Sequence, residues 1–189
     1  MRMPTIPARD DLESYLSFVR DKYGHKDSAH DFHHIEWIVH RLPMLAAEVV
    51  PSPRWDRLYF LACFHGLHAR WRDAPSFRRS AQEFLLSLGW DEDELDELLA
   101  SLERHLRSPE TIEEKIVHDA NYLGLLGALG IAKAFTSGGA RGQTFEETVE
   151  IYESCWLDRV EFLTPAGQRL AEEGRAYVKA FLGRLRSEW

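Results

Sequence analysis

Residues 110–135 read ETIEEKIVHDANYLGLLGALGIAKAF, and this stretch decides the fold class. Its first half is charged on one side, whereas from Tyr122 onward it is apolar nearly all the way round. A helix that is apolar on every side is stable only when other helices bury it. No segment of the chain shows the alternation with a period of two that is typical of strands. The sequence therefore predicts an all-α fold, a helical bundle with residues 110–135 inside it.

The rest of the chain shows helical periodicity on both sides of this stretch. Ser52 and Pro53 suit the start of a helix, Thr144 and Glu147 form a capping-box pattern, and Thr164 with Pro165 opens the last helix. The predicted helices are residues 8–24, 32–50 with a disturbance at Pro43, 52–65, 77–88, 91–107, 110–135, 144–163 and 164–185. Residues 70–76 and the Gly-rich residues 136–143 are predicted to be loops.

Length and composition exclude several classes of protein. The chain has 189 residues, 44% of them hydrophobic, and a net charge of −8, which predicts one globular domain over residues 1–189. A negative charge without a basic helix face argues against duplex nucleic acid as a partner. No apolar run reaches the roughly 20 residues of a membrane span, and the N-terminus does not resemble a secretory signal. We expect a cytoplasmic protein with no membrane partner.

Two histidines stand out among the nine of the chain. His34 lies between Phe32 and Ile35, and His65 follows Phe64, so each imidazole is set in an apolar frame on a different predicted helix. Metal sites in helical bundles are assembled from inward-facing side chains on different helices, and neutral imidazole is a common ligand. The pattern indicates a buried site that contains both imidazoles.

Four blocks of the chain, taken in order, resemble a known family. They are AHDFHHIEWIV from Ala29, LACFHG from Leu61, the block from Pro109 to Gly139, and FLTPAGQRLAEEGRAYVKAFL from Phe162. They are similar to blocks of the HD-domain metal-dependent phosphohydrolases, specifically the compact bacterial subgroup similar to nucleotide pyrophosphohydrolases. The resemblance covers residues 12–183. It implies a single-domain HD-type helical bundle, a divalent metal and a phosphate-ester substrate.

The resemblance places two metal ligands and departs at two others. His34 matches the first histidine ligand and His65 the histidine of the adjacent His-Asp pair. Gly66 stands where that pair has its aspartate, and Asn121 stands where the later helix supplies an aspartate. Asp119 matches an acid of the same block, and the early pair His30 and Asp31 is retained. The resemblance gives His30, Asp31 and Asp119 the proton-handling, catalytic roles.

The loss of two carboxylates should weaken the binding of hard, oxygen-preferring Mg²⁺ or Mn²⁺ most. His68, three residues beyond His65, lies on the same face if that helix continues, and His105 or Asp119 approach from other helices. A nitrogen-rich site of this kind with His34, His65, Asn121 and His68 favours Zn²⁺, Ni²⁺ or Fe²⁺ over Mg²⁺. The candidate cofactor is therefore a divalent metal ion, one of Mn²⁺, Ni²⁺, Zn²⁺, Fe²⁺ and Co²⁺. The alternative is that no metal binds.

Basic residues near the two histidines are candidates for binding phosphate. Arg70 and Arg72 follow His65 closely, in a region that borders the substrate pocket of the family, and guanidinium groups suit bidentate phosphate binding. Lys115 matches a family lysine, and His105 completes this substrate-binding set. The alternative for the two arginines is a solvated loop whose charges have no ligand.

Two functions of different classes follow. The first is a phosphohydrolase that acts on a nucleotide or another small phosphate ester, with altered or weak metal dependence. The second is a catalytically inactive HD-like domain, a pseudoenzyme, that binds a small anion or a protein partner. A DNA-binding regulator fits poorly because the chain is acidic. The sequence leaves the oligomeric state open, including a homodimer.

Overall fold

The computed structural model describes residues 9–23 and 32–188, and these residues form two compact units. The first unit ends at Val117 and the second begins at His118, so the boundary lies inside one helix, α7 (Ile112–Tyr122). Each unit is described by itself. The organisation of residues 1–189 as a single domain stays a prediction.

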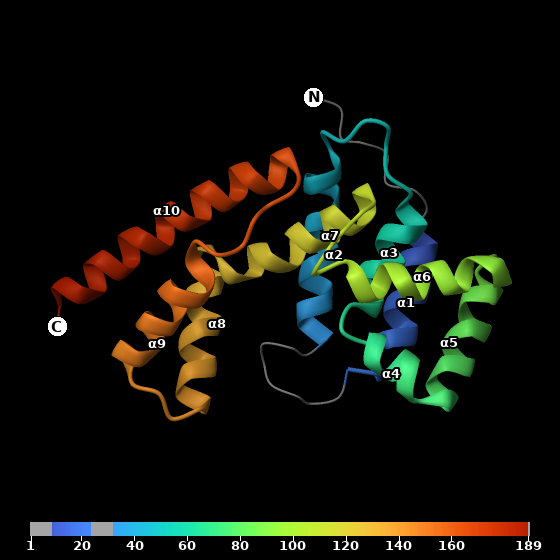
Figure 1. Cartoon of the computed structure of the whole chain (residues 1–189), viewed down its shortest axis with the longest axis horizontal. Helices are drawn as coiled ribbons and strands as arrows, with labels where there is room; N and C mark the ends of the chain where they lie inside the picture. Colours follow the sequence, from blue (N-terminus) through green and yellow to red (C-terminus); the bar gives the residue numbers. More distant parts are fainter. Residues whose placement is uncertain (1–8, 24–31, 189) are drawn as a thin grey trace. The chain divides into compact units, whose positions relative to one another are not determined.

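The first unit is built on a helix that is buried on almost every side (Figure 1). This helix, α3, packs against α1, α2 and α6, while α4 packs against α5 and α6. Leu58–Phe64 are all buried, because α3 lies in the middle of its neighbours. The bounds of the helices are α1 (Arg9–Arg20), α2 (Phe32–Ala46), α3 (Trp55–Phe64), α4 (His68–Asp73), α5 (Pro75–Ser87) and α6 (Glu92–Arg104).

Aromatic side chains fill the core of the first unit. Phe18 of α1 stacks on Phe84 of α5, with ring centroids 4.2 Å apart and planes at 7°, and its ring lies 5.7 Å from that of Phe64. The buried indole of Trp90 donates a hydrogen bond of 2.7 Å to the Tyr15 hydroxyl. Large rings bury much apolar area with few rotatable bonds, so this cluster fixes the position of the C-terminal end of α3.

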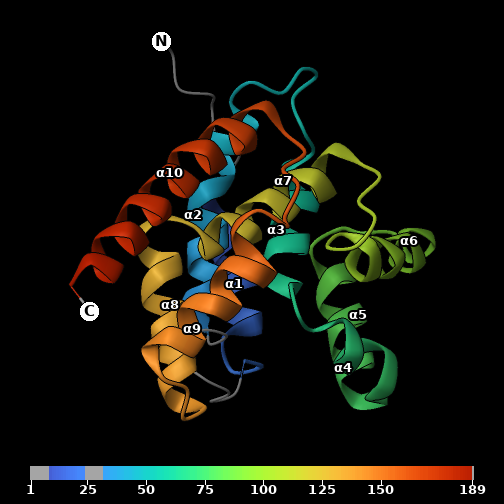
Figure 2. The ribbon, with the colours of Figure 1, turned by 60° about the vertical axis from the view of Figure 1, so that its left-hand side comes forward.

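The second unit holds the rest of α7 and the helices that follow it. In Figures 1 and 2, α9 runs alongside α8, and α8 packs against both α9 and α10. The phenol of Tyr152 donates a hydrogen bond to the Leu125 carbonyl, which ties α9 to the turn before α8. The elements are η1 (Leu123–Leu125), α8 (Gly127–Ala140), α9 (Phe145–Tyr152), the π-helix η2 (Glu153–Leu157) and α10 (Pro165–Ser187).

The stretch 110–135 is not one helix, which corrects the prediction. Leu126 is extended, with φ −115° and ψ 168°, and Gly127 follows with φ 64°, so the chain turns by 65° between residues 112–125 and 127–140. A positive φ is strained for residues other than glycine, and the position of Gly127 therefore marks the break. The apolar residues are buried as expected, but they are shared between two helices.

Other boundaries also differ from the predictions. The helix predicted over 32–50 ends at Ala46, and the one predicted over 144–163 ends at Leu157. Helix α3 begins at Trp55 with Arg54 as N-cap, so Ser52 and Pro53 lie before it. The predicted loop 70–76 contains most of α4 and the start of α5. The predicted Gly-rich loop begins only after Ala140, because α8 continues through Gly138, which lies against Thr148 of α9 too closely to admit a Cβ atom.

The predicted fold class is confirmed, since the described residues contain helices and no strand. The capping box of Thr144 and Glu147 and the N-cap Thr164 are formed as predicted. In the part of the chain that the structure describes, no single helix is long and apolar enough to cross a membrane. One bent pair, Ile112–Leu125 with Gly127–Ala140, meets that requirement by length and composition.

Candidate functional site

Three imidazole rings form a row in the first unit. His34 of α2, His65 at the C-terminal end of α3 and His105 at the C-terminal end of α6 contribute one ring each. The ring centroids of His34 and His65 are 5.4 Å apart, and those of His65 and His105 are 5.2 Å apart, each pair meeting edge to face. His65 and His105 are buried and His34 is half-buried. The predicted proximity of His34 and His65 is therefore present.

The hydrogen bonds of the row define its tautomers. His105 Nδ1 lies 2.7 Å from the carbonyl oxygen of Leu102, which can only accept, so Nδ1 carries the proton. In a neutral ring Nε2 of His105 is then an acceptor, and it lies 2.9 Å from Nδ1 of His65. Nδ1 of His65 therefore donates, and in the neutral pair the lone pair of His65 is on Nε2. A ring fixed in this way presents a proton acceptor or a ligand nitrogen at a defined position.

Gly66 has a local structural explanation. The explanation lies in the backbone conformation: His65 has φ −47° and ψ 122°, and Gly66 has φ 80°. The amide of Leu67 donates to the Phe64 carbonyl at 2.8 Å. These values define a type II β-turn, which requires a positive φ at its third residue and therefore favours glycine. A Cβ atom at Gly66 would meet nothing within 4 Å, so the turn, and not a lack of space, favours glycine.

Tyr23 holds the end of α3 from outside. Its hydroxyl donates to the carbonyl oxygens of Cys63, at 2.8 Å, and His65. Burial raises the pKa of Tyr23 well above its ordinary value, with a further contribution from Cys63, so the phenol stays protonated and remains a donor. Carbonyls at a helix end have no partner within the helix, and Tyr23 satisfies two of them.

In the second unit, Asp119 is fully buried, and both of its carboxylate oxygens accept hydrogen bonds from other residues of the chain. Its oxygens accept hydrogen bonds from the amide of Leu163 (3.0 and 3.1 Å), the amide of Thr164 (2.8 Å) and the hydroxyl of Thr164 (2.7 Å). Nδ1 of His118 lies 3.0 Å from Oδ1. The carboxylate thus positions the N-cap of α10. This arrangement is structural, and the predicted catalytic role of Asp119 gains no support from it.

The predicted arginines have partners within the protein. Arg70 donates to the Lys22 carbonyl at 2.5 Å, next to the end of α1, and Arg72 pairs with Asp73 at 2.8 Å. Both arginines are exposed. Lys115 is half-buried on α7. Their roles in binding substrate stay predictions.

The remaining predicted residues are placed as follows. His30 and Asp31 lie outside the described residues. His68 is the first residue of α4, because the chain turns at Gly66, so the condition that would put it on the same helix face as His65 is not met. Asn121 lies half-buried on α7, in the second unit.

The described residues do not present a complete set of metal ligands of the types His, Cys, Asp and Glu. Within residues 9–23 and 32–188, no group of three or more His, Cys, Asp or Glu side chains is placed to hold a metal ion. Nδ1 of His65 faces His105, Gly66 has no donor, and the oxygens of Asp119 already accept backbone and hydroxyl protons. The ligand set His34, His65, Asn121 and His68 stays a prediction.

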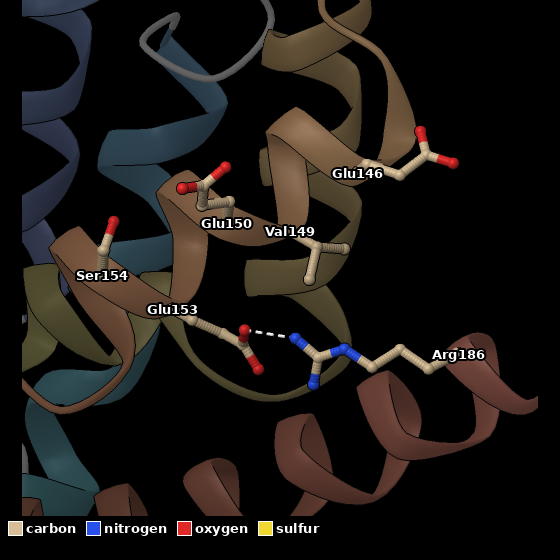
Figure 3. A pocket seen from close by; sticks show the side chains of 6 residues that line it. All are labelled: Glu146, Val149, Glu150, Glu153, Ser154 and Arg186. Carbon is tan, nitrogen blue, oxygen red and sulfur yellow. Dashed lines mark hydrogen bonds and ion pairs between the residues drawn. The ribbon is translucent and has the colours of Figure 1, made fainter.

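A separate groove of about 440 Å³ lies in the second unit, between α9, η2 and the end of α10 (Figure 3). Glu146, Val149, Glu150 and Ser154 line it. Figure 3 shows Arg186 reaching from α10 to Glu153 of η2, and these two side chains form an ion pair. Glu146 points away from that pair. The groove has acidic walls but no histidine.

The sequence analysis missed two features of the first unit. The hydrogen bond between His65 and His105 joins residues 40 positions apart, and no local pattern indicates it. The second feature is Arg41, which the sequence analysis does not name as a candidate for binding an anion. It follows His34 by seven residues and therefore lies two helical turns along the same face. That spacing was the available signal.

Solved structures share this fold across nearly the whole chain. Bacillus subtilis YpgQ, solved in complex with ADP, is 20% identical, with 95% of each chain covered and a TM-score of 0.76. An HD-superfamily hydrolase from Bacillus thuringiensis is 23% identical, with 96% of this chain and 97% of that chain covered and a TM-score of 0.77. A predicted HD-superfamily hydrolase from an uncultured Thermotogales bacterium is 22% identical, with 94% and 92% covered and a TM-score of 0.66.

These likenesses show the fold. The chain has the HD-domain superfamily fold, as the sequence predicts. No protein-family model matches the sequence, and no curated protein matches it significantly.

Proposed function

We propose that this protein is an HD-type phosphohydrolase-like protein whose histidine row receives the phosphate group of a nucleotide or another small phosphate ester, with weak or altered metal dependence. The single observation that carries this proposal is the row of half-buried His34 and buried His65 and His105, in which the hydrogen bonds leave the lone pair of His65 on Nε2. YpgQ, which shares the fold, was solved with ADP, and this supports a nucleotide as the first substrate to test.

The residues of the row can bind and hold a proton. An imidazole N–H can donate to a phosphate oxygen, and the lone pair on Nε2 of His65 can take a proton from an attacking water. HD-superfamily hydrolases are generally metal-dependent, and a divalent ion, if bound, would stabilise the charge on the phosphoryl oxygens. Because Gly66 provides no carboxylate, we expect slow hydrolysis.

The experiment measures phosphate and pyrophosphate release from a panel of nucleotides, without added metal and with Mn²⁺, Co²⁺, Ni²⁺ or Zn²⁺. We expect a low rate in the wild type and its loss in His65→Ala and His34→Ala. His40→Ala is the matched control, since His40 is an exposed histidine on the same helix as His34. Equal rates in all four proteins would place the reaction elsewhere or assign it to a contaminant.

The second candidate is a catalytically inactive domain that binds a small anion or a protein partner. The type II turn at Gly66 and the structural commitment of Asp119 favour it, because both positions lack an available carboxylate. Its signature is a rise in melting temperature with a nucleotide or pyrophosphate in the absence of any turnover. Turnover that depends on His65 would contradict it.

A further inference from the structure

Arg41 of α2 is a cation whose surroundings do not neutralise it. Its guanidinium carbon lies over the ring of Trp37, 3.4 Å from the ring centroid. Its Nη1 atom is buried and has no hydrogen-bond partner within the described part of the chain. A buried donor without a partner is uncommon and calls for an explanation, such as an ion or a ligand that binds there.

The electrostatics agree with this geometry. Burial lowers the pKa of Arg41 to about 10, and no carboxylate among residues 9–23 and 32–188 forms an ion pair with it. This is unusual in a chain of net charge −8. Arg104, by comparison, pairs with Glu97 and Glu114. Arg41 therefore lacks the anionic partner that a desolvated guanidinium requires.

The position of Arg41 on α2 relates it to the histidine row. His34, Trp37 and Arg41 are separated by three and then four residues, so they are neighbours along one helix face. Side chains on a helix lean toward its N-terminus, and the guanidinium over Trp37 is accordingly displaced toward His34.

We propose that Arg41, supported by Trp37, is the anion-binding residue of the histidine row and binds the phosphate group of its ligand. A guanidinium over an aromatic ring keeps its N–H groups in the plane of the guanidinium, directed outward, where they match two oxygens of a phosphate. The proposal rests on the proposed function for the identity of the ligand. It does not require hydrolysis.

The test is calorimetric titration of the full chain with inorganic pyrophosphate at constant ionic strength. We expect wild type to bind and Arg41→Met to lose affinity by about tenfold or more, because a charge-assisted, two-pronged contact is removed. Arg41→Lys keeps the positive charge but not the planar guanidinium, so it should lose less affinity for pyrophosphate than Arg41→Met. Arg141→Met is the matched control, because Arg141 is exposed and lies in the second unit.

Thermal melting without ligand separates this role from a structural one. Removing an unsatisfied buried cation should leave Arg41→Met at least as stable as wild type, whereas a stabilising Arg41 would make it less stable. Pyrophosphate binding by Arg41→Met equal to wild type, or no binding by wild type, overturns the inference. Arg41-dependent binding without turnover supports the inference and contradicts the enzyme. Turnover with an unchanged KM in Arg41→Met overturns the inference alone.

Discussion

Each of the two units contains a buried hydrogen-bonded pair that includes a histidine, and the two pairs are built differently. In the second unit, His118 faces a carboxylate, and the oxygens of that Asp119 also accept hydrogen bonds from Leu163 and Thr164. In the first unit, His65 faces another histidine, and the series of hydrogen bonds runs from Leu102 through His105 to His65. The first arrangement uses its acceptors to join segments of the chain. The second fixes the tautomer of His65, with the lone pair on Nε2.

This difference separates a polar residue whose contacts join segments of the chain, Asp119, from one whose contact sets the tautomer of a neighbouring ring, His105. Asp119 lies in the block that carries the family resemblance, yet its contacts position α10. His105 matched no ligand of the family, yet it sets the tautomer of His65. Substitutions at Asp119, Glu114, Gly66 and His105 test which of these residues stabilise the fold and which set the state of the histidine row.

Asp119→Ala should destabilise the protein by about 3–5 kcal/mol, because it leaves several buried donors without an acceptor. Urea unfolding followed by circular dichroism would measure this loss. Asp158→Ala, at an exposed carboxylate of the same unit, serves as the control and should change stability by less than about 1 kcal/mol. A loss for Asp119→Ala as small as the control would show that Asp119 does not hold α10.

In the first unit, the carboxylate of Glu114 has a structural role similar to that of Asp119, because it accepts hydrogen bonds from other segments of the chain. Burial alone would raise the pKa of Glu114, but hydrogen bonds from Ser101, the Glu110 amide and Arg104 outweigh it and hold the pKa below the ordinary value of 4.5. Its contribution to stability is therefore complete above about pH 4.5 and is lost as the pH falls through the lowered folded-state pKa.

Glu114→Gln should consequently reduce stability at pH 7 by about 1–3 kcal/mol and flatten the fall in stability below pH 4.5. Unfolding curves at pH 7, 5, 4 and 3 would measure both effects. Glu110→Gln, at an exposed neighbour, is the control. A mutant curve parallel to the wild-type curve would contradict the assignment.

Gly66→Ala should destabilise by about 1–2 kcal/mol, since alanine disfavours the left-handed conformation that the turn requires. Gly66→Asn should lose less, because asparagine adopts that conformation more readily. Gly139→Ala, in α8 with open space around it, is the matched glycine control and should be neutral or slightly stabilising. Equal effects at the two glycines would mean that the turn does not constrain Gly66.

His105→Phe should reduce the free energy of unfolding by about 1 kcal/mol, the net contribution of one buried hydrogen bond. It should also change the tautomer of His65, because Nδ1 of His65 loses its acceptor. Nitrogen NMR shifts of the His65 ring in wild type should show the proton on Nδ1. In His105→Phe that preference should be lost. A wild-type ring protonated on Nε2 alone would contradict the series of hydrogen bonds that runs through His105.

Local sequence signals predicted the helices well where caps and periodicity agree. Thr144 with Glu147, and Thr164 with Pro165, start helices as expected, because a cap acts over three or four residues. The proximity of His34 and His65 followed from their apolar frames on two different helices and from the family resemblance. The break at Leu126 was missed because its apolar neighbours fit one long helix equally well, and only packing against Tyr152 and α10 separates the two helices.

The roles of individual polar residues were harder to predict because they depend on distant partners. Asp119 meets Thr164 across 45 positions, and the carboxylate pattern alone does not distinguish a ligand from a structural acceptor. Gly66 was read as a missing carboxylate, whereas its backbone conformation supplies an independent reason for glycine. Arg41 was missed because an unpartnered cation can be recognised only when its surroundings are known.

Tyr23 and His105 together hold His65 by both its backbone and its ring. The imidazole is therefore preorganised, and the conformational entropy of fixing it is lost during folding and not during binding. Proton donors that reach Nε2 should meet a rigid acceptor, and small compact ligands should gain from that rigidity more than long flexible ones.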